Sequence, residues 1–468
     1  MSDTDPTKIA VQQQRTALKG RVIMPGDPEY DRARTVFMGG IDRRPAAIAR
    51  VADATDVTHV IALARETGLE LAIRNGGHSA AGHSVSDGGI VLDLRDMRTL
   101  KIDSERRTAW ADAGLTAGEY TTAAGAYGLA TGFGDTGSVG IGGITLGGGI
   151  GYLVRKHGLT IDDLLAADMV TADGQLRRVD AETHPDLFWA IRGGGGNFGV
   201  VTRFQYRLHP VDTVVGGLLI LPATPDVIAR FVAAADAAPK ELSSIANVMK
   251  APPLPIIPAE MHGQLIVMAM LVYAGEVEAG QRVVAPFRAL DVPLADMIRP
   301  MPYQAIFPPE DVNNHPVAAQ RTMFLDHIDR GAAETIIDYL QASTAQLAAT
   351  QIRVLGGAMA RVPAEATAFA HRDARLMVGL TAVYGHPDEA PMQESWVHQF
   401  ANALYRGDDA SDRAYVNFLA DEGVARIRAA YPGTTWDRLA EIKGRYDPTN
   451  LFRLNQNIPP VTNGIARP

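Results

Sequence analysis

The segment from residue 132 to 151, GFGDTGSVGIGGITLGGGIG, contains ten glycines in twenty positions. Flexible linkers are rich in serine and other polar residues, whereas these glycines alternate with valine, isoleucine and leucine. Glycine allows the backbone to approach another surface closely, and N–H groups presented in this way can bind anionic groups. The segment therefore predicts an ordered stretch of chain that is pressed against something large, with backbone N–H groups facing it.

Helices and strands are expected to alternate through the first part of the chain. Residues 56–67 carry apolar side chains at helical spacing, with Thr55 or Asp56 as the expected N-cap and Gly68 where the helix should stop. The other elements expected in this part are strands over 71–74, 90–94 and 109–114 and a helix over 117–127, all after an irregular stretch over 1–40. This alternation favours an α/β or α+β fold over an all-α fold.

The pattern changes after Pro210 and indicates a second domain with a large sheet backed by helices. Apolar segments at 216–221, 264–273 and 375–384 alternate with helical stretches such as 333–344. Strand alternation over 264–273 places apolar side chains on both faces, which predicts a sheet that is covered on both sides. The proline-rich segments 251–258 and 301–309 are expected to be loops, and residues 445–460 are expected to be ordered.

Composition excludes several classes of protein. A length of 468 residues favours two or three domains, and the absence of cysteine excludes disulfides, thiolate nucleophiles, iron–sulfur clusters and cysteine-based zinc sites. The net charge of −9 argues against a nucleic-acid partner. The polar N-terminus lacks the apolar region of a signal peptide, and no run of about 18 apolar residues predicts a membrane span. We therefore expect a cytoplasmic protein.

The turn Arg74-Asn75-Gly76-Gly77-His78-Ser79 follows an expected strand and could form a nest of N–H groups around a phosphate. On its own it is better explained as a surface turn with a structural or solvated histidine. Together with the glycine-rich segment and residues 195–202 (GGNFGVVT), however, it could wrap one extended dinucleotide. The glycine spacing does not match a Rossmann fingerprint, and the chain contains no Walker A loop.

Five stretches resemble the berberine-bridge-enzyme-like group of the vanillyl-alcohol-oxidase (PCMH-type) FAD oxidoreductases. They are residues 74–94, 139–174, 186–202, 414–418 and 446–458, and the resemblance covers nearly the whole chain. It implies an α+β, two-domain PCMH-type FAD-binding fold whose antiparallel-sheet substrate domain is backed by helices. The expected FAD-binding domain comprises residues 1–212, the substrate domain comprises residues 213–412, and the C-terminal segment 413–468 returns to the FAD domain.

The resemblance also implies the position of the cofactor. It sets the FAD pyrophosphate on the turn 74–79, makes His78 the residue bonded to the flavin 8α-methyl carbon, and brings the C-terminal asparagines near the isoalloxazine. The expected cofactor-binding residues are Arg74, Asn75, Gly76, Gly77, His78, Ser79, His83, Ser84, Asp135, Thr136, Ser138, Val139, Gly142, Gly143, Gly148, Gly199, Val200, Val201, Asn455 and Asn457.

One position departs from the pattern of many relatives, which attach the flavin through a second residue, a cysteine. Thr136 occupies that position here, and its hydroxyl is too basic to form the link as a thiolate would. We therefore expect mono-covalent FAD, held through His78 alone, with a more accessible flavin ring and a lower reduction potential than in doubly linked relatives.

The resemblance implies that a hydride passes from a C–H bond next to oxygen or nitrogen to flavin N5, while a base removes a proton from the substrate. Tyr415 is the first candidate for that base, although it could instead be a packed wall of the pocket. If residues 414–418 form a strand, Asn417 points to the same side as Tyr415 and supports it through hydrogen bonds. Tyr152 is a further candidate pocket residue, and no metal site is expected.

Val139 stands three residues after Thr136, where small aliphatic side chains occur in oxygen-reactive relatives. It favours an oxidase that reduces O2 to hydrogen peroxide. The alternatives are a dehydrogenase with another acceptor, a non-catalytic flavin-binding protein, and a nicotinamide-dependent enzyme. The expected substrate is a small alcohol, amine or sugar; its identity and the oligomeric state do not follow from the sequence.

Overall fold

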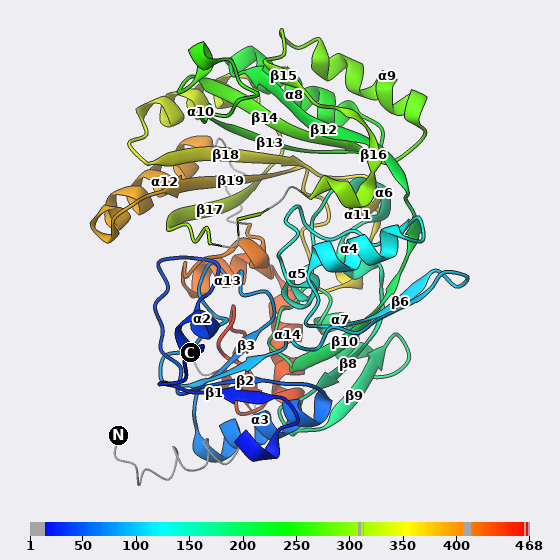
Figure 1. The fold of residues 1–468 in the computed structure, drawn as a ribbon, viewed down its shortest axis with the longest axis vertical. Coiled ribbons are helices and arrows are strands. Elements are labelled where there is room, and N and C mark those ends of the chain that lie inside the picture. The colour runs from blue at the N-terminus through cyan, green and yellow to red at the C-terminus, as the bar shows by residue number, and fades with distance from the viewer. Residues whose placement is uncertain (1–14, 308–309, 312, 406–412, 463–464, 467–468) are drawn as a thin grey trace.

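The computed structural model describes residues 15–307, 310–311, 313–405, 413–462 and 465–466. The described chain forms a lower part, built from N-terminal and C-terminal segments, and an upper part dominated by one large sheet (Figure 1). The structure confirms the predicted α+β fold with an antiparallel sheet backed by helices. The domain limits at 212 and 412 remain a prediction.

The first sheet of the lower part has the strand order β1 (Arg21–Ile23), β2 (Ala47–Arg50), β4 (Ile90–Asp93) and β3 (Leu71–Arg74). Strands β2, β4 and β3 are parallel, and helix α3 (Ala54–Thr67) connects β2 to β3. The helix ends at Gly68, which adopts φ 69°, as predicted. Parallel pairing therefore occurs only within this small sheet among the described strands.

The N-cap of α3 differs from the prediction. Asp53 caps the helix by accepting hydrogen bonds from the N–H groups of Thr55 and Asp56. The carboxylate of Asp56 has a different use, since it accepts the N–H groups of Lys19, Gly20 and Ala52. Asp56 therefore fastens the segment before β1 to the start of the helix.

A five-stranded antiparallel sheet completes the lower part. Its order is β5 (Leu100–Asp103), β6 (Thr108–Asp112), β10 (Val200–Arg207), β8 (Leu164–Val170) and β9 (Leu176–Asp180). Helix α4 (Ala117–Gly125) follows β6 and begins with a capping box between Thr116 and Glu119. One hydrophobic core joins both sheets to the C-terminal helices, with Val60, Met169 and Ile442 among its members.

The upper part contains the eight-stranded antiparallel sheet. Its order is β15 (Ala295–Asp296), β12 (Thr213–Pro222), β14 (Leu265–Tyr273), β13 (Leu242–Lys250), β18 (Leu347–Val354), β19 (Leu376–Val383) and β17 (Ala318–Leu325), with β16 (Arg299–Pro302) also on β12. Helices α8 (Pro225–Ala237), α9 (Val277–Arg288), α10 (Arg330–Ala342) and α12 (Ala390–Leu404) cover its outer face (Figure 1).

Strand β14 confirms the prediction of a sheet that is covered on both faces. Val267, Ala269 and Leu271 belong to the core under the helices, whereas Ile266 and Val272 belong to clusters on the opposite face. The inner face of this sheet is therefore available to pack against the lower part of the molecule.

Two segments are more regular than predicted. The stretch expected to be irregular before residue 40 contains β1 and the short helix α2 (Tyr30–Arg34). The segment 301–309 was expected to be a loop, but it contains the end of β16 and the 3-10 helix η3 (Tyr303–Ile306), while residues 308–309 lie outside the described residues. The two prolines in β16 are compatible with a strand because β16 pairs on one side only.

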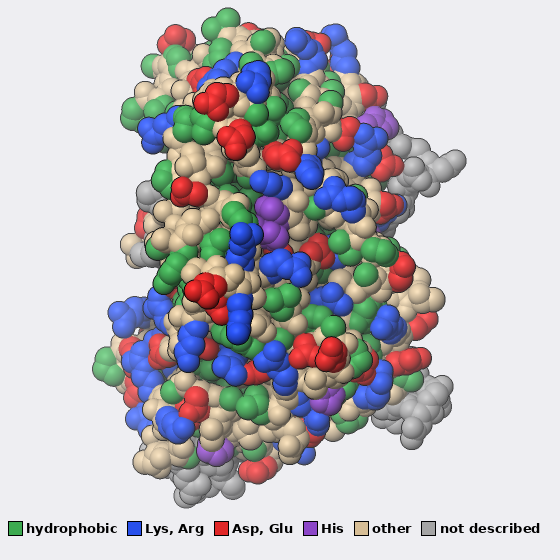
Figure 2. Space-filling view, turned by 90° about the vertical axis from the view of Figure 1, so that its right-hand side faces the viewer, with side chains coloured by type: hydrophobic (Ala, Val, Ile, Leu, Met, Phe, Trp, Pro, Cys, Tyr) green, Lys and Arg blue, Asp and Glu red, His purple; other side chains and the backbone are tan. Residues whose placement is uncertain are grey.

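The charged side chains of the surface are mixed in sign. On the face shown in Figure 2, basic and acidic side chains are interspersed over both the upper and the lower part. Among the described residues, no helix has both the length and the hydropathy needed to cross a bilayer.

The C-terminal segment returns to the lower part through α13 (Val424–Ala430) and α14 (Thr434–Tyr446). A fully buried ion pair of Lys443 and Asp447 holds the chain at the end of α14, with 2.6 Å between Nζ and Oδ2. Lys443 also donates to the carbonyls of Asn197 and Phe452, and Asp447 accepts the N–H groups of Leu451 and Phe452. This network positions residues 451–457 beside the segment 195–201.

We expect Asp447→Ala to lower the free energy of unfolding by about 3–5 kcal/mol, because it leaves the buried ammonium group of Lys443 without a counter-charge. The control is Glu334→Ala, which removes the acid of an exposed pair with the same i,i+4 spacing and should cost no more than about 0.5 kcal/mol. Chemical denaturation of both variants measures the difference. Equal losses in the two variants would show that the buried pair is not needed for stability.

Candidate functional site

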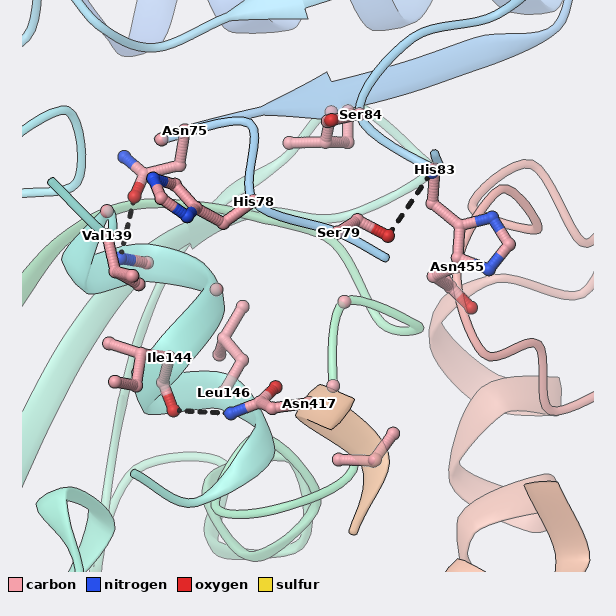
Figure 3. A pocket seen from close by; sticks show the side chains of 18 of the residues that line it. Asn75, His78, Ser79, His83, Ser84, Val139, Ile144, Leu146, Asn417 and Asn455 are labelled. Carbon is pink, nitrogen blue, oxygen red and sulfur yellow. Dashed lines mark hydrogen bonds between the residues drawn. The ribbon is translucent and has the colours of Figure 1, made fainter. Parts of the chain in front are cut away.

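A cavity of about 410 Å³ lies between the lower part and the inner face of the upper sheet. Five segments supply most of its lining: the turn after β3, helix α5 (Ile141–Gly147) with the residues before it, the segment 195–201, the 3-10 helix η6 (Val416–Phe418), and residues 452–456. Figure 3 shows side chains of the turn, of α5, of η6 and of the C-terminal segment converging on this space.

Asn75 ties the turn after β3 to the start of α5. Its amide nitrogen donates to the carbonyl of Ala113, and its Oδ1 accepts the N–H of Gly142 at 3.1 Å (Figure 3). The backbones also touch, since a Cβ on Gly76 would lie 2.4 Å from the backbone nitrogen of Gly140. Glycine at both positions is therefore a condition for bringing the two segments together.

His78 occupies a fixed position on the cavity wall. Its ring stacks on that of Phe37, with 4.3 Å between the ring centroids, and Nε2 lies 3.0 Å from Oγ of Ser138. Burial lowers the pKa of His78, against a smaller raising effect from Glu310. The imidazole is consequently neutral at neutral pH and keeps a nitrogen lone pair.

The glycine-rich segment serves mostly contacts within the protein. A Cβ on Gly147, Gly149 or Gly151 would lie 2.0 Å or less from an atom of Asn417, Thr160 or Phe133, respectively. Gly143 differs, because it lines the cavity and a Cβ there would meet nothing within 4 Å. The prediction that the segment is pressed against something large is correct, but most of that surface belongs to the chain itself.

Tyr415 and Asn417 form a hydrogen-bonded pair in the cavity. The tyrosine hydroxyl accepts the N–H of Gly149 at 2.9 Å and Nδ2 of Asn417 at 3.0 Å. Asn417 also donates to the carbonyl of Ile144 (Figure 3). Residues 416–418 form a 3-10 helix rather than a strand, but both side chains still reach one space.

Burial raises the pKa of Tyr415 to about 12, although its two hydrogen-bond donors and the nearby guanidinium of Arg353 act in the opposite direction. Arg353 is itself buried on β18, pairs with Asp135 at 2.8 Å, and lies over the ring of Phe418. The tyrosine therefore sits beside a fixed positive charge at the inner face of the upper sheet.

Several polar atoms of the cavity have no partner within the described part of the chain. Nδ1 of His83, Oγ of Ser84 and Oδ1 of Asn455 are buried without a hydrogen bond. Buried polar groups are normally satisfied, so these atoms indicate a polar group that the cavity is built to hold. With the open face of Gly143, they fit an extended, polar cofactor such as a dinucleotide.

The cavity brings together most of the predicted site residues, but not all of them. The predicted residues that line it are Asn75, Gly76, Gly77, His78, Ser79, His83, Ser84, Asp135, Thr136, Val139, Gly142, Gly143, Gly199, Val200, Val201, Tyr415, Asn417 and Asn455. Ser138 does not line the cavity, but its Oγ lies 3.0 Å from Nε2 of His78. Gly148 lies against the rings of Phe369 and Tyr415. Asn457 is not among the lining residues, and its Oδ1 is buried without a partner in the described structure.

Arg74 and Tyr152 are directed elsewhere. The guanidinium of Arg74 donates to the carbonyls of Ala33, Arg34 and Ser84, so it fixes the backbone around the turn. Tyr152 is packed in a separate apolar cluster with Tyr303, where burial raises its pKa. Neither side chain lines the cavity.

The unpredicted residues at or near the cavity include Phe37, Gln320 and Arg353. Phe37 lies 37 residues before the start of the turn at Arg74. Gln320 and Arg353 lie on β17 and β18 of the upper sheet. No local motif marks them, because each reaches the site through tertiary structure alone.

Comparisons with known proteins agree with this geometry. Residues 45–180 match the family described as FAD binding domain, and residues 414–459 match the family described as berberine and berberine like. The chain is 30% identical to the uncharacterized FAD-linked oxidoreductase YgaK of Bacillus subtilis (strain 168), over 97% of this chain and 99% of the relative. It is also 30% identical to (R)-6-hydroxynicotine oxidase of Paenarthrobacter nicotinovorans, over 95% and 97% of the two chains.

Solved structures show the same fold. The crystal structure of 6-hydroxy-D-nicotine oxidase from Arthrobacter nicotinovorans matches with a TM-score of 0.84 and 26% identity, over 94% of this chain and 98% of that chain. A chitooligosaccharide oxidase matches with a TM-score of 0.83 at 22% identity, over 97% and 100%.

We expect Gly143→Ala to reduce the flavin content of the purified protein without lowering its thermal stability. The added methyl group projects into the cavity, whereas the change from glycine to alanine favours the helix by up to about 1 kcal/mol. Gly147→Ala is the contrasting variant, because its methyl group would displace Asn417 and should lower stability. Absorbance at 450 nm and thermal unfolding measure the two effects; full flavin content in Gly143→Ala would contradict the cofactor's expected position.

Proposed function

The chain belongs to the berberine-bridge-enzyme-like family of FAD-linked oxidoreductases, and from this premise we propose that it is an oxidase with FAD attached through His78. The proposed reaction removes a hydride from a C–H bond next to oxygen or nitrogen in a small alcohol, amine or sugar. The observation that carries the proposal is a single cavity lined by His78, the open face of Gly143 and the Tyr415–Asn417 pair.

The residues around the cavity suit the two ends of FAD. We assign the turn 75–79 and the polar atoms of His83, Ser84 and Asn455 to the binding of its polar groups. Bound FAD supplies the two-electron acceptor for the hydride, at N5. The residues of the chain then have to orient the substrate, exclude water and accept one proton from the substrate.

Attachment through His78 alone is supported by two features of the chain. His78 is neutral, immobilised by Phe37 and directed along the cavity wall, which suits a nucleophile. Thr136 also lines the cavity, but a threonine hydroxyl does not supply the thiolate that a second link requires. We therefore propose one covalent bond to the cofactor.

Tyr415 is proposed to take the substrate's proton as the hydride leaves. The N–H groups of Gly149 and Asn417 both donate to its oxygen, which favours the anionic form of the phenol. Arg353 supplies a nearby positive charge of the kind that a tyrosine base needs. With a pKa of about 12, only a small fraction of Tyr415 is anionic at neutral pH, and that fraction grows as the pH rises.

O2 is the proposed electron acceptor. Val139 lines the cavity close to the start of α5, and its small aliphatic side chain leaves more room than a larger residue would. Relatives include oxidases of an amine, (R)-6-hydroxynicotine, and of a sugar, xylooligosaccharide, so both substrate classes belong in the first assay panel.

The covalent link predicts that acid-denatured protein stays yellow after pelleting, whereas His78→Ala releases its flavin into the supernatant. Visible spectra of both fractions provide the measurement.

Turnover with a panel of amines, alcohols and sugars should yield hydrogen peroxide in proportion to the O2 consumed. Reduction of an artificial dye without peroxide formation would instead identify a dehydrogenase, and a colourless protein that FAD cannot reconstitute would refute the assignment.

If Tyr415 is the base, kcat/KM should rise by about tenfold per pH unit from pH 7 to 10, since its reactive anionic form accumulates toward the pKa of about 12. Tyr415→Phe should lower kcat by a factor of about 10²–10⁴ and abolish this slope. Tyr152→Phe is the matched control, because Tyr152 is also buried but does not line the cavity. An unchanged slope in Tyr415→Phe would show that Tyr415 only shapes the pocket.

A further inference from the structure

A short hydrogen-bond chain leads from the cavity wall to the surface through His78, Ser138 and Glu310. Nε2 of His78 lies 3.0 Å from Oγ of Ser138, and that hydroxyl donates to Oε2 of Glu310. The other carboxylate oxygen, Oε1, accepts the backbone N–H of Ser138 at 3.0 Å. Both carboxylate oxygens of Glu310 therefore accept hydrogen bonds from Ser138.

The chemistry of the three groups sets the direction of this chain. An ionised carboxylate can only accept hydrogen bonds, so the single proton of the Ser138 hydroxyl points to Glu310. The serine oxygen must then accept the remaining hydrogen bond from His78, which requires the proton of the neutral imidazole to be on Nε2. The lone pair is left on Nδ1. Stacking on Phe37 holds the ring in this orientation.

We propose that Glu310 is a positioning residue for flavin attachment, which acts through Ser138 to hold His78 with Nδ1 as the nucleophile and to receive the Nε2 proton. The inference rests on the proposed link through His78. It assigns a role to two residues that lie outside the cavity lining and that the proposed oxidase reaction does not use.

The attachment step explains why a carboxylate is useful at this position. As Nδ1 bonds to the 8α carbon, the imidazole becomes cationic, and the Nε2 proton passes to Ser138 while the serine proton passes to Glu310. The 8α carbon would lose one proton to solvent, and the electron pair of that C–H bond would reduce the flavin. O2 then takes up the two electrons with two protons and leaves as hydrogen peroxide. Burial, which lowers the pKa of His78, would otherwise oppose the cationic ring.

Glu310 reaches His78 from a distant part of the sequence, 172 residues after Ser138 and shortly before β17 of the upper sheet. The geometry consequently links attachment of the cofactor to contact between the upper and lower parts of the molecule. The next residue, Asp311, carries the same charge as Glu310, but its carboxylate accepts the N–H of Asn313 and not that of Ser138.

The test uses the full chain, isolated without flavin from riboflavin-starved cells and then mixed with FAD in air. Intact-mass spectrometry follows the covalent adduct with time, and absorbance after gel filtration reports FAD that is bound without a link. We expect Glu310→Gln and Ser138→Ala each to slow attachment at least tenfold while still binding FAD. The double variant should be no slower than the slower single variant, because both act in one chain. Asp311→Asn is the matched control and should attach FAD at the wild-type rate.

A second measurement does not depend on the variants. Proteolysis of the wild-type protein and NMR of the flavinyl peptide identify the linked imidazole nitrogen, which should be Nδ1. Linkage through Nε2, a wild-type rate in Glu310→Gln, or equal slowing in Asp311→Asn would each overturn the role of Glu310. If Glu310→Gln binds no FAD at all, the attachment rate of Ser138→Ala becomes the test. A wild-type attachment rate in Ser138→Ala would overturn the proposal. Wild-type protein without any covalent flavin would overturn the proposed link itself.

Discussion

The close approach of two glycine-containing segments is the contact on which the site depends. The turn after β3 and the residues before α5 meet so closely at Gly76 and Gly140 that neither position has room for a side chain. Asn75 secures the contact by accepting the N–H of Gly142, and it is itself held by donating to the carbonyl of Ala113. Because His78 follows on one segment and Gly143 on the other, this one contact defines two walls of the cavity.

The same constraint explains why so much glycine is needed in one stretch. Asn417 fits against Gly147, and Thr160 fits against Gly149, so the α5 region is surrounded on most sides by the chain's own atoms. The packing leaves Gly143 as an open position toward the cavity. Close packing of this kind holds the open position at Gly143 fixed relative to Tyr415.

Local sequence patterns predicted the elements that are built from neighbouring residues. Helix α3 with its end at Gly68, strand β14 with two covered faces, and the turn that carries His78 all depend on short-range spacing. The resemblance to a family supplied 18 of the 39 residues that line the cavity. The N-cap of α3 was misplaced by two or three residues because Asp56, a plausible cap, accepts three other N–H groups.

Residues that reach the site through tertiary structure could not be predicted in this way. Arg353 and Glu310 come from strands and loops of the upper part, and nothing in their local sequence refers to His78 or Tyr415. The converse also occurs, since Arg74 and Tyr152 stand within motifs but direct their side chains into other parts of the protein. Side-chain direction is decided by packing partners that are far away in the sequence.

The path of the chain has a consequence for its synthesis. Asn75 and His78 are translated long before Tyr415, Asn417 and Asn455, which line the same cavity. The buried pair of Lys443 and Asp447 can then bring the final segment beside residue 197. A chain that has not yet reached residue 415 thus possesses only part of the cavity wall, so the closed cavity forms only after the segment 415–456 has been made.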